Sequence, residues 1–265
     1  MKSILFSFLL FFAFSNMNAQ DFALQQLENS PRHQEWVEIQ SGDRTLHAFV
    51  VYPEVSTYSL AVVVIHENAG LTNWVRSFSD QLAGKGFLVI APDLLSSFDE
   101  NHKKTSDFTT GDAARNAIYQ LNPDQVTQDL EAALQYIAKD PSSNGKTAIM
   151  GFCWGGSETF RFATNNDEVL AGLVFYGSPP KNFVEIQKIN APVYGFYGGN
   201  DQRINATIPE TEKWMKEAGK TFDYVIYPRA GHGYMRQGDS PAATPENLNA
   251  KNQSWQRIVE ILERL

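Results

Sequence analysis

The sequence lacks features that many protein classes require. It contains a single cysteine, Cys153, so no disulfide bond can form within the chain. Basic residues are outnumbered, with 22 Lys and Arg against 30 Asp and Glu, and the formal net charge is −8. Because no basic run offsets this charge, nucleic acid and anionic membrane surfaces are excluded as partners. The absence of repeats and of low-complexity linkers favours one domain.

Long hydrophobic runs are also lacking, apart from a short one at the start. Residues 4–14 are almost entirely apolar, Lys2 precedes them, and a polar stretch ending at Ala19 follows. This pattern is typical of a secretory signal peptide over residues 1–19. The run is about half of the roughly 20 residues that a membrane-spanning helix needs. We expect the mature chain, residues 20–265, to be soluble, without a membrane anchor, and secreted or periplasmic.

Short apolar runs alternate with helical patterns along the rest of the chain. The runs are typical of buried strands and occupy residues 44–52, 60–65, 86–90, 146–150, 170–175, 192–197 and 222–227. Apolar residues at helical spacing occupy 74–83, 123–138, 154–163, 209–218 and 249–265. The alternation predicts a single-domain α/β fold with a mostly parallel sheet flanked by helices on both faces. Residues 96–120 break it and are predicted to form a loop with a short helix.

The segment Met150-Gly151-Phe152-Cys153-Trp154-Gly155-Gly156 joins a predicted strand to a predicted helix. Its small residues permit a sharp turn that presents Cys153 at the helix start, the arrangement of a nucleophile elbow with sulfur in the usual place of serine. A lone cysteine is more often a buried apolar residue, but that role does not need the flanking glycines. Because a helix N-terminus favours an anion, we expect a reactive thiolate.

Two further residues that can carry chemistry follow predicted strands. Asp201 lies in a turn after 192–197, and His232 lies between glycines after 222–227. In an open α/β sheet, the site lies outside the carboxyl ends of the strands. The order Cys153, Asp201, His232 is that of the α/β-hydrolase triad, in which the nucleophile attacks, imidazole exchanges the proton and carboxylate orients the imidazole. An Asp in such a turn is often only structural, but the three residues together predict catalysis.

Glu67 ends another buried strand and is expected either to contact the thiol or to remain a solvated loop carboxylate. A zinc site of the H-E-x-x-H type is excluded because position 70 is Gly, and no metal or other cofactor is expected. The backbone N–H groups of Trp154 and Asn68 are predicted to form an oxyanion hole, which needs the residue after the nucleophile and one early loop.

These features resemble the dienelactone hydrolase family. The resemblance covers about residues 35–265 and rests on the cysteine elbow, His66-Glu67, the Asp201 and His232 loops, and Asp129-Leu130-Glu131-Ala132-Ala133. It implies a single-domain α/β hydrolase that opens a small enol-lactone, such as 4-carboxymethylenebut-2-en-4-olide, through a thioester intermediate.

The resemblance also implies roles for individual residues. Glu67 matches a glutamate that holds the resting thiol and moves toward deprotonating it when substrate binds. Arg236, four residues after His232, is implied to bind the substrate carboxylate. Arg115 with Tyr119 reproduces the family's R-x-x-x-Y spacing and is implied to share this task. Arginine suits it because its planar fork pairs with both carboxylate oxygens.

Other functions remain open at this point. One is an esterase for acyl or aryl esters of extracellular saccharides, and another is a non-catalytic binding protein with a hydrolase fold. The intact triad argues against the second, and a redox-sensing thiol would lack a resolving cysteine in the chain. We expect a monomer, and a Cys153→Ser variant that folds but loses most activity because the site is suited to a thiol of low proton affinity.

Overall fold

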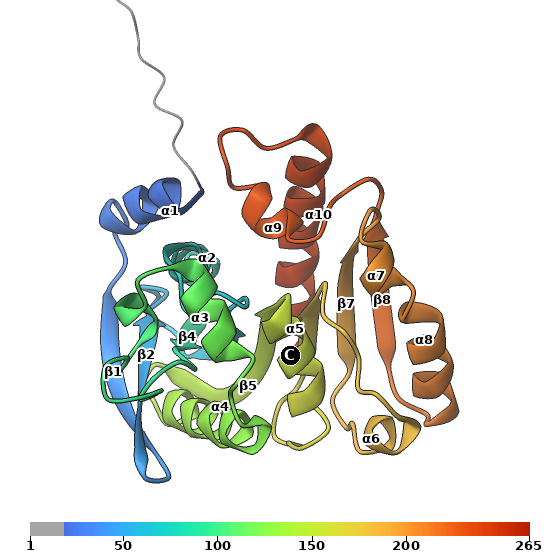
Figure 1. Cartoon of the computed structure of the whole chain (residues 1–265), viewed down its shortest axis with the longest axis horizontal. Coiled ribbons are helices and arrows are strands. Elements are labelled where there is room, and N and C mark those ends of the chain that lie inside the picture. Colours follow the sequence, from blue (N-terminus) through green and yellow to red (C-terminus); the bar gives the residue numbers. More distant parts are fainter. Residues whose placement is uncertain (1–18) are drawn as a thin grey trace, which may run out of the picture.

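The computed structural model describes residues 19–265 and contains one sheet that runs across the molecule from β1 to β8 (Figure 1). The strand order is β1-β2-β4-β3-β5-β6-β7-β8, and only the β1–β2 and β2–β4 pairs are antiparallel. The strands are β1 (Gln34–Ser41), β2 (Arg44–Val51), β3 (Ser59–Ile65), β4 (Leu88–Pro92), β5 (Ser143–Phe152), β6 (Gly172–Phe175), β7 (Val193–Gly198) and β8 (Phe222–Tyr227). The predicted α/β fold with a mostly parallel sheet is therefore confirmed.

Helices cover both faces of this sheet (Figure 1). They are α1 (Ala19–Glu28), α2 (Asn73–Ala83), α3 (Gly111–Ile118), α4 (Pro123–Ala138), α5 (Trp154–Phe162), α6 (Phe183–Gln187), α7 (Gln202–Asn205), α8 (Ile208–Glu217), α9 (Tyr234–Gln237) and α10 (Pro245–Leu262), with a 3-10 turn, η1, at Thr105–Asp107. Several begin with a side-chain cap, such as Thr110, whose hydroxyl accepts the Ala113 N–H at the start of α3.

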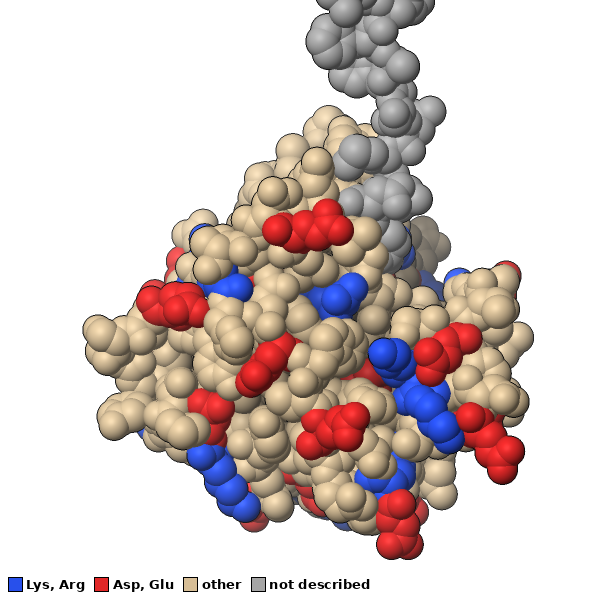
Figure 2. Space-filling view, turned by 90° about the vertical axis from the view of Figure 1, so that its left-hand side faces the viewer, with Lys and Arg blue, Asp and Glu red and all other residues tan. Residues whose placement is uncertain are grey.

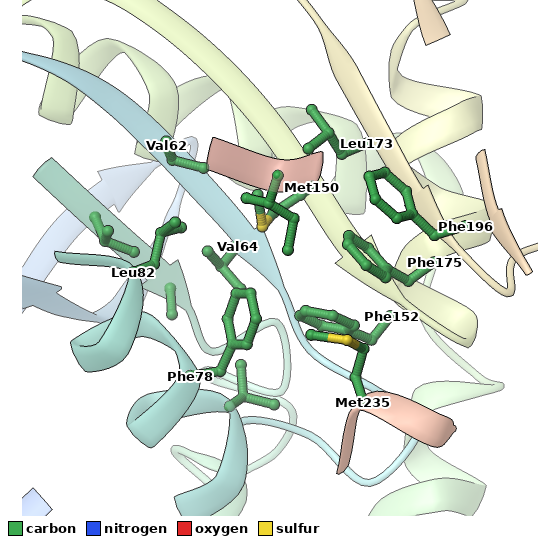
Figure 3. Close-up of a cluster of buried hydrophobic side chains, with 14 of the residues drawn as sticks. Val62, Val64, Phe78, Leu82, Met150, Phe152, Leu173, Phe175, Phe196 and Met235 are labelled. Carbon is green, nitrogen blue, oxygen red and sulfur yellow. The ribbon is translucent and has the colours of Figure 1, made fainter. Parts of the chain in front are cut away.

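The central strand β3 explains why the core has two halves. Its seven residues are all buried, and successive side chains point to opposite faces of the sheet. Val62 and Val64 pack into the half beneath α2 and α10, whereas Val63 and Ile65 pack into the half beneath α4. Figure 3 shows the first half, where aromatic and aliphatic side chains from neighbouring strands meet helix α2. Buried apolar area of this kind provides most of the stability of the sheet.

The sequence analysis did not predict two elements before residue 44, the strand β1 and the helix α1. Strand β1 is an edge strand whose residues are largely exposed or half-buried, and its only buried apolar residue is Ile39. Its sequence therefore lacks the continuous apolar run of a central strand. Helix α1 is short, but it buries Ala23 and Leu27 against the same half of the core as α2.

The irregular segment 96–120 contains the 3-10 turn η1 and the helix α3, which confirms the predicted loop with a short helix.

On the face that carries β1, basic and acidic side chains are interspersed and form no region of one sign (Figure 2). Within residues 19–265, no helix is both long and apolar enough to cross a membrane. The predicted signal peptide falls on residues 1–19, almost all of which lie outside the described part of the chain.

Candidate active site

The turn that carries Cys153 has the geometry of the predicted elbow. Strand β5 ends at Phe152, α5 begins at Trp154, and Cys153 between them has a positive φ of 56° with ψ of −112°. The neighbouring backbones approach so closely that a Cβ at Gly151 would lie 2.2 Å from the Gly155 carbonyl oxygen. A side chain there would displace the helix from the strand, which explains the need for glycine. The strained conformation of Cys153 points its sulfur out of the sheet edge.

The structure brings Cys153, His232 and Asp201 together in one chain of contacts. The His232 Nε2 lies 3.1 Å from the Cys153 Sγ, and the His232 Nδ1 lies 2.5 Å from the Asp201 Oδ2. Asp201 follows β7 and is buried, and His232 follows β8 directly before a left-handed Gly233. The three side chains thus come from the carboxyl ends of β5, β7 and β8, which are neighbours through β6. This arrangement can move a proton from sulfur to imidazole while the carboxylate stabilises the imidazolium.

The pKa of the resting thiol differs from the one expected from the sequence. The pKa of Cys153 is raised, first by burial and then by the negative charge of Glu67. The backbone N–H of Trp154 and the charge of Arg203 act in the opposite direction but do not outweigh these effects. The expected thiol of low proton affinity is therefore wrong for this state, because desolvation exceeds the contribution of the helix N-terminus. A protonated thiol is suited to donate to Nε2 of His232.

Glu67 lies at the site, but its partner differs from the expected one. Its Oε2 accepts a hydrogen bond from Arg236 Nε at 2.7 Å, and the carboxylate is almost fully buried. The same contact is the main cause that raises the pKa of Arg236. Among the described residues, the hydrogen-bond partner of the thiol is His232 rather than Glu67. Glu67 thus acts on the resting sulfur through its charge, and Arg236 holds it in place.

The two residues predicted for the oxyanion hole follow neighbouring strands, Trp154 after β5 and Asn68 after β3. The Trp154 N–H stabilises the anionic form of Cys153, so it points toward the sulfur. Asn68 directly follows Glu67, and its side-chain Nδ2 donates to the hydroxyl of Tyr119 at 3.2 Å. Tyr119 therefore borders the site from the end of α3, although 64% of it is exposed. The role of the Asn68 backbone N–H stays a prediction.

Arg115 is not brought to the sulfur. Its guanidinium pairs with Asp112, one turn earlier on α3, at 2.6 Å, and 47% of the Arg115 side chain is exposed. Arg115 and Tyr119 are four residues apart and so lie on one side of this helix. Only Tyr119 of the two makes a hydrogen bond to the loop of Glu67 and Asn68 within the described residues.

The sequence analysis assigned no role to two aromatic neighbours of the site, His66 and Tyr176. His66 is fully buried, donates from Nδ1 to the Glu67 carbonyl, accepts the Leu94 N–H at Nε2, and stacks on the Trp154 indole. These contacts require the neutral imidazole, and burial lowers its pKa accordingly. Tyr176 follows β6 with a positive φ of 41° and packs its ring edge-on against His232. Its position after a strand was a usable signal, because the site lies at strand ends.

The sheet order, the elbow after β5 and the three connected side chains define an α/β hydrolase. The model of the dienelactone hydrolase family matches residues 46–265, and the chain belongs to this family. It is accordingly an enzyme of the carboxylic ester hydrolase type, as the resemblance predicted.

Curated relatives agree with this assignment. A protein of Methylorubrum extorquens classed as a carboxymethylenebutenolidase is 32% identical over 210 residues, which cover 75% of this chain and 71% of the relative. An Escherichia coli protein of the same class is 30% identical over 84% of this chain and 83% of its own length.

Solved structures show the same fold. One, classed as a dienelactone hydrolase from Klebsiella pneumoniae, has a TM-score of 0.77 at 24% identity and covers 88% of this chain and 99% of its own. The dienelactone hydrolase of Anabaena variabilis has a TM-score of 0.63 at 17% identity and covers 84% of this chain and 95% of its own.

Proposed function

We propose that this protein is an exported cysteine hydrolase that opens a lactone or cleaves a small carboxylic ester of the dienelactone type. The observation that carries the proposal is the contact of the Cys153 sulfur with His232 and of His232 with Asp201. The curated relatives classed as carboxymethylenebutenolidases support the lactone as the first substrate class.

In the proposed reaction, the Cys153 Sγ attacks the carbonyl carbon while its proton passes to the His232 Nε2. The carbon–oxygen bond then breaks, His232 returns the proton to the departing oxygen, and a thioester remains on Cys153. The Trp154 N–H, together with that of Asn68, would stabilise the charged oxygen of the tetrahedral intermediate. Water, activated by His232, then hydrolyses the thioester and restores the thiol.

The decisive experiment detects the thioester itself. Purified protein is mixed with 4-carboxymethylenebut-2-en-4-olide or with p-nitrophenyl acetate, quenched rapidly and analysed by mass spectrometry. We expect the mass of the acyl group on the peptide that contains Cys153, and loss of turnover after alkylation with iodoacetamide. The Cys153→Ala variant serves as the control. Full turnover by alkylated protein would refute a thiol mechanism.

One observation favours a second substrate class, a neutral ester such as an acyl or aryl ester of an extracellular saccharide. Both arginines implied to bind a substrate carboxylate already pair with carboxylates of the protein, Arg236 with Glu67 and Arg115 with Asp112. A neutral ester would bind without displacing either pair. Comparison of kcat/KM for the carboxylate-bearing lactone and for p-nitrophenyl acetate decides between the classes, because only the lactone requires the pairs to open.

Export is proposed on the first 19 residues alone. In a Gram-negative host that expresses the full chain, we expect the protein in the periplasmic fraction with Gln20 as its first residue. Intact Met1 on a cytoplasmic product would overturn this part of the proposal and leave the proposed chemistry untouched.

A further inference from the structure

A second cavity lies apart from the triad, between strand β1, the start of α2 and the segment 104–111. Its volume is about 610 Å³. Polar and aromatic side chains dominate its lining, with Trp36, Thr72, Arg76, Lys104, Ser106 and Phe108 as the members used below. None of Cys153, Asp201, His232 or Glu67 lines it. The loop that follows Glu67 and Asn68 forms one wall, through Ala69 and Leu71.

Arg76 brings a positive charge into this cavity without a counter-charge. Its guanidinium lies 5.7 Å from the ring centre of Trp36 and 5.5 Å from that of Phe49, and it donates to the Asn73 Oδ1. No ion pair joins it to a carboxylate within residues 19–265. Burial lowers the pKa of Arg76. A half-buried cation without a counter-charge is costly, and an anion placed beside it would be stabilised.

The acidic residue in the lining does not provide that anion. Asp93 is buried, and its two oxygens accept from the Thr105 N–H at 2.7 Å and from the Thr105 hydroxyl at 2.6 Å. The Leu95 N–H also donates to it, at 3.2 Å. These bonds fix Asp93 as part of the wall that holds the segment 104–111, and no ion pair joins it to Arg76 within residues 19–265.

Further groups in the lining suit a polar, anionic ligand. Lys104 is exposed and adds a second positive charge at the cavity. Thr72 belongs to the lining through its other atoms, because its hydroxyl oxygen is inaccessible to solvent. Ser106 is exposed and adds a hydroxyl group to the lining. Trp36, 46% exposed, and the half-buried Phe108 offer aromatic surface of the kind on which the apolar face of a sugar ring packs.

We propose that this cavity binds a hydroxylated organic carboxylate of the sugar-acid class, with the carboxylate on Arg76. The guanidinium fork matches a carboxylate in two hydrogen bonds, and the hydroxyl-bearing side chains match the hydroxyl groups of the ligand. A neutral sugar would leave Arg76 without a counter-charge. A dianion such as phosphate is disfavoured against a monoanion, because the chain carries a net charge of −8. The proposal does not depend on the proposed hydrolase function.

Isothermal titration with D-glucuronate tests the proposal. The Cys153→Ala protein is used, so that the result is independent of any acylation of the thiol. We expect glucuronate to bind and D-glucose, its neutral counterpart, not to bind. Arg76→Met keeps the apolar contacts with Trp36 and Phe49 but removes the charge, and should weaken glucuronate binding about 10- to 100-fold. Lys188→Met, which removes one exposed charge elsewhere, should bind as the parent does.

Two results would overturn the proposal: no heat of binding at about 10 mM glucuronate, or an affinity that Arg76→Met does not change. If Arg76→Met unfolds, as circular dichroism would reveal, Lys104→Met provides the test, because Lys104 is exposed. This variant should weaken glucuronate binding about threefold and leave the melting temperature unchanged. In that case, unchanged affinity in the folded Lys104→Met protein would overturn the proposal, and so would equal binding of glucose.

Discussion

The triad and the rim formed by residues 96–120 differ in how firmly the fold holds them. Cys153, Asp201 and His232 each follow a strand, and each contacts the next member. On the rim, Arg115 and Tyr119 are largely exposed and extend from a short helix. The sheet holds side chains at strand ends in place, whereas exposed side chains of a long loop segment are more mobile and tolerate more substitutions. The sheet therefore holds the triad in a fixed arrangement, whereas it leaves Arg115 and Tyr119 exposed beside the site.

The largest effect should come from the nucleophile. Cys153→Ser is expected to fold and to lose about a thousandfold in kcat/KM, because a serine hydroxyl gives up its proton to His232 far less readily than a thiol does. Hydrolysis of p-nitrophenyl acetate measures the loss, and circular dichroism confirms folding. A variant that keeps more than about a tenth of the activity would show that the site does not depend on sulfur.

The next effect concerns the two arginines that the family resemblance implies in substrate binding, Arg236 and Arg115. Arg236→Gln should lower kcat/KM for a carboxylate-bearing lactone about tenfold, since it removes a charge-assisted hydrogen bond, and Arg115→Gln should lower it less. Hydrolysis of p-nitrophenyl acetate by each variant is the control for indirect effects through Glu67. Equal losses on both substrates would place the arginines outside substrate recognition.

Glu67 should control the proton affinity of the thiol. Because its charge raises the pKa of Cys153, Glu67→Gln should lower that pKa and shift the pH profile of alkylation by iodoacetamide toward lower pH. The alkylation rate at pH 7 should therefore rise severalfold, since only the thiolate reacts. Glu217→Gln, a change on the exposed end of α8, is the matched control. An unshifted profile would mean that burial alone sets the pKa.

The smallest effect is expected in stability. The Tyr176 ring packs against His232, but its buried hydroxyl has no hydrogen-bond partner among the described residues. Tyr176→Phe keeps the ring and removes the hydroxyl, and should stabilise the protein by about 1 kcal/mol. Urea unfolding of both proteins measures the difference. A loss of stability instead would reveal that the hydroxyl makes a favourable contact.

Much of the fold and the triad could be predicted because the signals are local. Buried strands such as β3 have continuous apolar runs, and the glycines around Cys153 mark a turn that few other structures need. Asp201 and His232 were found because they follow such strands. Strand β1 was missed because an exposed edge strand has no apolar run.

The electrostatics of the site could not be predicted in the same way. The raised pKa of the thiol results from burial and from Glu67, and the pairing of Glu67 with Arg236 joins residues 169 positions apart. Neither is visible in a short segment. The unpaired state of Arg76 likewise depends on which carboxylates other elements bring near it. Such pKa values and ion pairs depend on contacts between segments that are far apart in the sequence.

Residues 19–45, which precede the family match, are part of the packed structure of this molecule. The family match begins at residue 46, yet α1 places Ala23 and Leu27 in the core. Arg32 and Gln34 both donate to the Asp80 carboxylate of α2, and β1 covers the open edge of β2. A chain trimmed to residues 46–265 would expose an unpaired strand edge and leave Asp80 buried without its cation. The stability of the sheet edge and of Asp80 thus depends on residues that precede the family match.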